Sequence, residues 1–343
     1  MTVRRSWTAL LAVALVVAAP IAWAGPGGPR ATTAPDGSHV VSAERGADGL
    51  VELTVYSAAM DRTVPVAVLP AADPDAPAPV LYLLNGVDGG LPDAGDWRAG
   101  NNWFTRTDAA ALFRDEQVTV VMPIGGQGSF FADWRADDPV LGRNRWSTFL
   151  TAELAPVIDA AFHGTGIAGL AGPAMAGPAV FRLAAADPAR YRAIGAFSGC
   201  VRTSDPAGRA MVHTVVSVRH GDAANMWGPP DAPAWADNDA YLHAERLRGV
   251  SIYVSTGNGL PGPLDTLDGP GIDDDLYTLA DQMVVGGGLD GVAAVCTRQL
   301  RDRLTELGIP ATFDFRPSGT HSWGYWAEDL RNAWPGMRAA LQR

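Results

Sequence analysis

The segment that decides the fold is Ile167-Ala168-Gly169-Leu170-Ala171-Gly172-Pro173-Ala174-Met175-Ala176. Its first six residues form a short apolar run of the kind that is buried in a sheet. The Ala-rich stretch 175–186 predicts a helix, and only a tight turn separates it from the strand. A strand, a turn and a helix therefore follow one another with Ala174 in the turn.

Strand-like and helix-like segments alternate on both sides of this unit. Two alternating segments separated by a turn predict an antiparallel pair at 51–56 and 64–69. Further strands are predicted at 79–84, 118–122, 193–198, 250–255 and 311–315, and further helices at 146–162, 290–307 and 325–341. This alternation predicts an α/β fold with a mostly parallel central sheet and helices on both faces.

The N-terminus has the features of a secretory signal peptide. Arg4 and Arg5 precede an apolar run at 9–19 and the small-x-small sequence Ala22-Trp23-Ala24, so we expect cleavage after about Ala24 (1–24). The run is shorter than the roughly 20 residues that cross a bilayer, so no transmembrane span is expected. We expect a secreted protein, extracellular or associated with the cell wall, with a flexible Gly- and Pro-rich linker at 25–47 and one domain at 48–343.

Composition limits the partners and the cofactors. The chain has a formal net charge of -11 and no cluster of basic residues, which disfavours nucleic acid as a partner. In an exported chain, two cysteines favour a Cys200–Cys296 disulfide, with two buried thiols as the alternative. His213 and His220 have no further ligands at metal spacing, and the aspartates of 264–276 predict a solvated loop, so neither a metal nor another cofactor is expected.

The turn at Ala174 has the position of the nucleophile elbow in the α/β-hydrolase fold, where the pattern is Gly-x-Ser-x-Gly. The chain reads Gly172-Pro173-Ala174-Met175-Ala176, with small residues at both ends of the pattern and alanine in place of serine. A methyl group has no lone pair for attack, so no acyl-enzyme can form there. Pro173 is atypical beside an active elbow and favours natural loss of the serine over an engineered substitution.

The partners of a nucleophile in this fold follow it in the order acid, then histidine. Asp290 is the predicted acid, after the turn-like sequence Gly286-Gly287-Gly288. His321 is the predicted base, because it follows the last predicted strand and lies beside Trp323 and Trp326.

Several sequence segments are unusual in composition: Leu83-Leu84-Asn85-Gly86, Pro123-Ile124-Gly125-Gly126-Gln127, Met226-Trp227-Gly228-Pro229 and Gly319-Thr320-His321-Ser322-Trp323-Gly324-Tyr325-Trp326. Together they resemble the secreted mycolyltransferases, the antigen 85 or fibronectin-binding antigen family, over nearly the whole mature domain. The resemblance implies an esterase-like α/β hydrolase that moves mycolic acyl chains between trehalose esters and cell-wall glycan through a serine acyl-enzyme. It puts Ala174 at the serine position, Asp290 where the family usually has glutamate, and His321 at the base.

The same resemblance implies the rest of the site. The backbone N–H groups of Val87 and Met175 would form the oxyanion hole. The expected substrate contacts are Asn85, Asp88, Asn102, Trp227, Ser322 and Trp323. Asn85 and Asp88 stand where the family has aspartate and arginine, so an amide replaces a carboxylate and an acid replaces a five-donor guanidinium on the trehalose side.

Two hypotheses about function follow. In the first, the chain is a non-catalytic or strongly impaired homologue that binds a trehalose mycolate-type glycolipid, a cell-wall glycan or a host matrix protein, as the serine-lacking branch of the family implies. In the second, it is an active acyltransferase or esterase that uses another nucleophile or a water activated by His321. Retention of Asp290 and His321 favours the second, but the replacement candidates Ser198 and Ser322 do not lie at an elbow. The oligomeric state is unknown from sequence.

Overall fold

The computed structural model of the protein describes residues 33–91 and 95–343. The predicted signal peptide at 1–24 and the first part of the predicted linker, 25–32, lie outside the described residues. The linker prediction is wrong for the last part of that segment, because His39–Arg45 forms the strand β1. Most side chains of β1 are exposed or half-buried, so no alternation of apolar residues marked it in the sequence.

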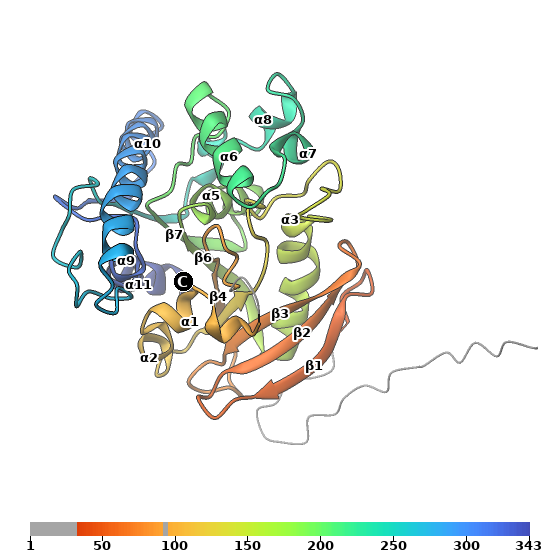
Figure 1. Cartoon of the computed structure of the whole chain (residues 1–343). Coiled ribbons are helices and arrows are strands. Elements are labelled where there is room, and N and C mark those ends of the chain that lie inside the picture. The colour runs from red at the N-terminus through yellow and green to blue at the C-terminus, as the bar shows by residue number, and fades with distance from the viewer. Residues whose placement is uncertain (1–32, 92–94) are drawn as a thin grey trace, which may run out of the picture.

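A nine-stranded sheet runs through the domain in the order β1-β2-β3-β5-β4-β6-β7-β8-β9 (Figure 1). The pairs β1–β2, β2–β3 and β3–β5 are antiparallel, and β5, β4, β6, β7, β8 and β9 run parallel to one another. The strands are β2 Val51–Ser57, β3 Arg62–Leu69, β4 Ala78–Leu83, β5 Thr119–Pro123, β6 Gly164–Pro173, β7 Tyr191–Phe197, β8 Ser251–Thr256 and β9 Thr312–Phe315. The predicted α/β-hydrolase class, with a mostly parallel sheet, is confirmed.

Helices cover both faces of the sheet, and each layer has its own core. One layer contains α3 Trp146–Thr148, the π-helical η2 Phe149–Leu154, α4 Ala155–Ala161, α5 Ala176–Ala186, α6 Pro206–Val218, α7 Ala223–Trp227, α8 Pro233–Asp237, η3 Ala244–Leu247 and part of α10 Gly287–Glu306. The other contains η1 Trp97–Ala99, α1 Trp103–Arg106, α2 Ala109–Phe113 and α11 Trp323–Leu341. The helix α9 Leu276–Asp281 and the π-helical η4 Gln282–Gly286 precede α10 and bury little of their surface.

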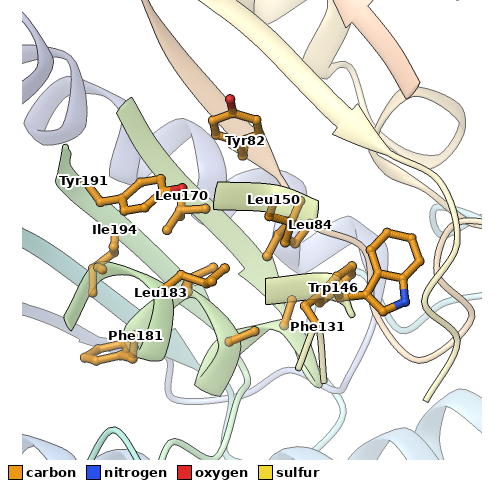
Figure 2. Packing of buried hydrophobic residues seen from close by; sticks show 14 of the residues in the cluster. Tyr82, Leu84, Phe131, Trp146, Leu150, Leu170, Phe181, Leu183, Tyr191 and Ile194 are labelled. Carbon is orange, nitrogen blue, oxygen red and sulfur yellow. The ribbon is translucent and has the colours of Figure 1, made fainter. Parts of the chain in front are cut away.

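The helix that follows the elbow packs directly on the strands beside it. Figure 2 shows Leu183 of α5 pointing toward Leu170 of β6 and Ile194 of β7, and all three side chains are at most 2% exposed. Burial of a leucine or isoleucine of this kind contributes about 1.5–3 kcal/mol. This packing holds α5 against β6 and β7, the strands on either side of it in the sequence.

The predicted disulfide is confirmed. Cys200 lies just after β7, Cys296 lies in α10, and their Cα atoms are 5.1 Å apart across 96 residues of sequence. The cross-link therefore ties the loop beside the elbow to the helix that carries Asp290.

Replacing both cysteines by serine is expected to lower the free energy of unfolding by about 4–5 kcal/mol, the chain-entropy value for a loop of this length. The measurement is urea unfolding of both proteins, with the reduced parent as a reference for the open form. A loss below about 1 kcal/mol would show that the cross-link does not constrain the unfolded chain.

Candidate active site

The topology brings the site residues to one edge of the sheet. Neighbouring parallel strands end at the same edge, so the loops after β4, β6, β8 and β9 meet there. The loop after β4 carries Val87, the turn after β6 carries Ala174, and the loop after β9 carries His321. Asp290, in the first turn of α10, reaches this edge through the amide of Gly257 after β8, which donates to its Oδ2 at 2.8 Å.

Ala174 has the backbone of a nucleophile elbow. Its φ is +51°, in the left-handed region, which costs a non-glycine residue about 1–2 kcal/mol. Its N–H donates to the Phe197 carbonyl at 2.8 Å and its carbonyl accepts from Gly177 at 3.0 Å. A Cβ on Gly172 would lie only 2.4 Å from the Cβ of Ala176, so glycine is required before the turn. The strained turn is kept although the side chain cannot attack.

Asp290 and His321 form a hydrogen-bonded pair. Nδ1 of His321 lies 2.8 Å from Oδ1 of Asp290, whose side chain is fully buried. Burial alone would raise the pKa of this carboxyl, but the hydrogen bond and charge of His321 and the Gly257 amide outweigh burial, so the pKa lies below its usual range. The ionised acid orients the imidazole, and Nε2 forms no hydrogen bond within the described part of the chain. The pair therefore has the geometry of a general base with its orienting acid.

The amides predicted to form the oxyanion hole have no competing partner. Neither the N–H of Val87 nor that of Met175 donates a hydrogen bond within residues 33–91 and 95–343. The Val87 carbonyl accepts from Gly128 at 3.0 Å, which fixes the orientation of this loop. Both donors are thus available for a developing oxyanion.

Three of the six predicted substrate contacts are core residues. Asn85 is fully buried and donates to the Pro123 carbonyl at 3.2 Å. Asn102 is also fully buried and closes a capping box at the start of α1, while Trp227 is 1% exposed and packs edge-on against Trp235. These side chains support the loops around the site, and a sugar cannot reach them in this conformation.

The other three predicted contacts lie nearer to the surface. Asp88 forms an ion pair with Arg219 at 3.2 Å. Ser322 occupies the N-cap position of α11, but its side chain forms no capping hydrogen bond. Its hydroxyl is buried and has no partner among the described residues. Trp323 is half-buried between Trp103 and Trp326, with ring centroids 5.3 and 5.1 Å away. Asp88 and Trp323 are therefore the accessible members of the predicted set.

One prediction about the local backbone is wrong. The glycines at 286–288 do not form a turn but end η4 and begin α10, where the carbonyl of Gly286 accepts from His321. The aspartates at 268 and 273–275 are exposed, as predicted for a solvated loop, but Asp265 is only 7% exposed. Its carboxylate accepts from Thr320 at 2.6 Å and from Tyr325 at 2.8 Å, which holds the histidine loop in place.

Sequence reasoning missed the arginine behind the acid. Arg316 directly follows β9, and its Nη2 lies 3.7 Å from Oδ2 of Asp290 while its Nη1 donates to Asp329. Asp329 is 1% exposed, and its burial, opposed by Arg316, raises its pKa to about 6. The position of Arg316 after the last strand was the available signal, but a single basic residue there has no motif to identify it.

An exposed apolar surface borders the site. We call it the α9–α10 apolar face, and its side chains are 36–87% exposed: Leu276, Tyr277, Met283, Val284, Val285, Leu289, Val292 and Val295. Figure 1 shows α9 and α10 along one side of the molecule. Within the described residues, the stretch 276–306 is long and apolar enough to cross a bilayer, and only 28% of its apolar window is buried in the domain. Its buried Asp290 and its disulfide nevertheless tie it to the sheet.

An elbow, an acid and a histidine that meet at one edge of such a sheet define the α/β hydrolases. The Esterase family model matches residues 57–337. The chain belongs to the antigen 85 mycolyltransferase family within this class. It is 33% identical to the diacylglycerol acyltransferase/mycolyltransferase Ag85A of Mycobacterium tuberculosis over 288 residues, which are 78% of this chain and 75% of that protein.

Further comparisons agree with this assignment. Ag85B of Mycolicibacterium smegmatis is 33% identical over 276 residues, which cover 76% of this chain and 77% of the relative. The crystal structure of Mycobacterium tuberculosis MPT51 (FbpC1) superposes with a TM-score of 0.67 and 26% identity, covering 88% of this chain and 99% of that one. An S-formylglutathione hydrolase from Agrobacterium tumefaciens shares the fold, with a TM-score of 0.58 and 17% identity over 88% of this chain and 99% of its own.

The raised pKa of Asp329 predicts a pH-dependent effect of Asp329→Asn. The folded protein holds this proton more tightly than the unfolded chain, so the contribution of Asp329 to stability is full below about pH 4 and is lost as the pH rises through about 6. The stability of the parent minus that of the variant should therefore fall by about 2 kcal/mol between pH 4 and pH 7, because the unfolded chain is already partly ionised at pH 4. Urea unfolding across this range measures it, with Asp302→Asn in an exposed ion pair as the control. A difference that does not change with pH would contradict the assignment.

Proposed function

We propose that the protein is an exported member of its family that binds a glycolipid or cell-wall glycan and has little or no acyltransferase activity. The observation that carries the proposal is the methyl group of Ala174 at the strained elbow. With no hydroxyl there, His321 has no proton to remove from the elbow side chain, and the covalent intermediate of acyl transfer cannot form. Export is supported by the signal-peptide pattern and by the disulfide, which belongs to an oxidising compartment.

The α9–α10 apolar face supports a ligand with hydrocarbon chains. Asp290 lies on the same helix as this face, and Gly286 at its centre is hydrogen-bonded to His321, so the face adjoins the site. Exposed apolar surfaces of this extent mark contacts with lipids or with other proteins. A trehalose mycolate-type glycolipid would lay its acyl chains on this face and its sugar against Asp88 and Trp323. Binding to a host matrix protein has no comparable support.

The intact Asp290–His321 pair supports a second, slower activity. His321 Nε2 could take a proton from water, whose oxygen would attack the ester carbonyl while the amides of Val87 and Met175 hold the oxyanion. Collapse would break the bond to the alcohol, which leaves with the proton from His321. The products would be a free acid and an alcohol, and no acyl group would pass to a sugar. Triad proteins without a nucleophile keep a residual acceleration of about 10³–10⁴ over water.

Restoring the hydroxyl tests the proposal directly. In Ala174→Ser, ester hydrolysis is expected to rise by on the order of 10²-fold or more, because the elbow, base and oxyanion amides are already in place. Hydrolysis of a chromogenic acyl ester and acyl transfer to trehalose are measured for the parent, for Ala174→Ser and for Ala174→Ser/His321→Ala. The double variant is the control and should fall back to the rate of the parent or below it, because it also lacks the base of the slow water reaction.

The outcomes separate the hypotheses. An inert parent beside an active serine variant supports loss of the nucleophile alone. If both proteins are inert, the pocket has changed beyond the nucleophile and binding is its role. Acyl transfer by the parent itself would refute the proposal, because another nucleophile must then exist.

Binding is tested on the apolar face. Val284→Asp/Val292→Asp should weaken cosedimentation with vesicles containing a trehalose diester by at least about tenfold, since each exposed valine that enters lipid contributes up to about 1.5 kcal/mol. Val41→Asp, which alters an exposed valine of β1, is the matched control and should bind like the parent. Equal binding by all three proteins would show that the α9–α10 apolar face does not contribute to binding.

A further inference from the structure

A surface cavity of about 430 Å³ lies outside the triad and is not used by the proposed function. Its polar lining consists of Arg62 at the start of β3, Gln127 after β5, and Arg219 and His220 at the end of α6. Its volume lies within the roughly 300–1,000 Å³ of small-molecule sites. The question is which ligand chemistry this lining fits.

The lining is basic in a protein that is strongly acidic overall. The chain carries a net charge of -11, yet no carboxylate lines the cavity. Arg62 forms no salt bridge in the part of the chain that the structure describes, and its guanidinium lies 5.8 Å from the ring centroid of Trp146. Arg219 is paired with Asp88 on one side only, at 3.2 Å through Nη1. The cavity therefore offers positive charge that nearby acids do not fully neutralise.

The other two polar side chains also have unused hydrogen-bonding capacity. The Gln127 carboxamide and the His220 ring form no hydrogen bond within residues 33–91 and 95–343. His220 is held in the left-handed region with φ +61°. Guanidinium, amide and imidazole groups are the donors that bind phosphate or carboxylate oxygens together with hydroxyl groups.

The remaining lining is apolar. Val140 and Val218 are 61% and 59% exposed, and Leu141 lies beside them. A wall of this kind suits the C–H face of a sugar ring better than a small inorganic ion, which has no apolar surface to cover. We propose that this cavity binds a sugar carrying a phosphate or carboxylate group, with Arg62 and Arg219 on the anion and Gln127 on the hydroxyl groups.

The cavity is connected to the loop of the candidate oxyanion hole. Asp88, the partner of Arg219, directly follows Val87, and the N–H of Gly128 next to Gln127 donates to the Val87 carbonyl at 3.0 Å. A Cβ on Gly128 would lie 3.3 Å from the Arg219 side chain, so the loop after β5 is in close contact with the end of α6. An anion in the cavity competes with Asp88 for Arg219 and so acts on the position of the Val87 loop.

The test is isothermal titration of the purified protein with glucose 6-phosphate, glucose and inorganic phosphate at two salt concentrations. Glucose 6-phosphate is expected to bind more tightly than inorganic phosphate, glucose is expected not to bind measurably, and added salt should weaken binding. Arg62→Gln should weaken glucose 6-phosphate binding by about tenfold or more, because it removes a charge-assisted contact. Arg331→Gln is the matched control, since Arg331 is an exposed arginine of α11 paired with Asp108, and it should bind like the parent.

Each other result would overturn the proposal. Equal affinity for glucose 6-phosphate and inorganic phosphate would show that the sugar does not contribute to binding. Equal affinity for glucose and glucose 6-phosphate would show that the anionic group does not contribute. Equal binding by Arg62→Gln and the parent would place the ligand elsewhere. Because the parent and these variants all retain Ala174, the outcome does not depend on whether the triad region catalyses.

Discussion

The hydrogen bond between the buried carboxylate of Asp290 and His321 is the interaction on which the site depends. A fully buried aspartate is stable in its ionised form only when donors or positive charges surround it. Here the imidazole and the Gly257 amide donate to the carboxylate, and the Arg316 guanidinium lies 3.7 Å away as a further positive charge. These donors come from the loops after β8 and β9, so ionisation of one side chain requires both loops to be in place. Removing either donor would leave a buried charge without compensation, which explains why the region remains ordered around an elbow without a nucleophile.

The main features of the fold could be predicted from the sequence because each has a periodic signal. The apolar runs that became β4, β5, β6 and β7 are buried on both faces, and such runs are visible in any sequence. The strand β1 was missed because its side chains are half-buried or exposed and show no alternation, while its pairing with β2 uses backbone hydrogen bonds that leave no pattern in the residues. The helical glycines at 286–288 were missed because glycine has no side chain to reveal that tertiary contacts hold it in a helix.

The chemistry of the site was predictable only where position in the fold determines the role. Asp290 and His321 follow particular strands, and the structure brings them within 2.8 Å. Sugar contacts depend instead on which way a loop side chain turns, and resemblance to relatives does not fix that. Asn102 is an example, because its amide is used entirely for capping α1 and for bonding nearby carbonyls.

The disulfide between Cys200 and Cys296 has a consequence for when the site is completed. It joins the loop after β7 to the acid-bearing helix, and such bonds form and persist outside the reducing cytosol. A newly made chain inside the cell holds these two parts of the site together by packing alone. The site therefore gains its final rigidity only where this bond can form, and under the proposed export that oxidation is the last step of its maturation.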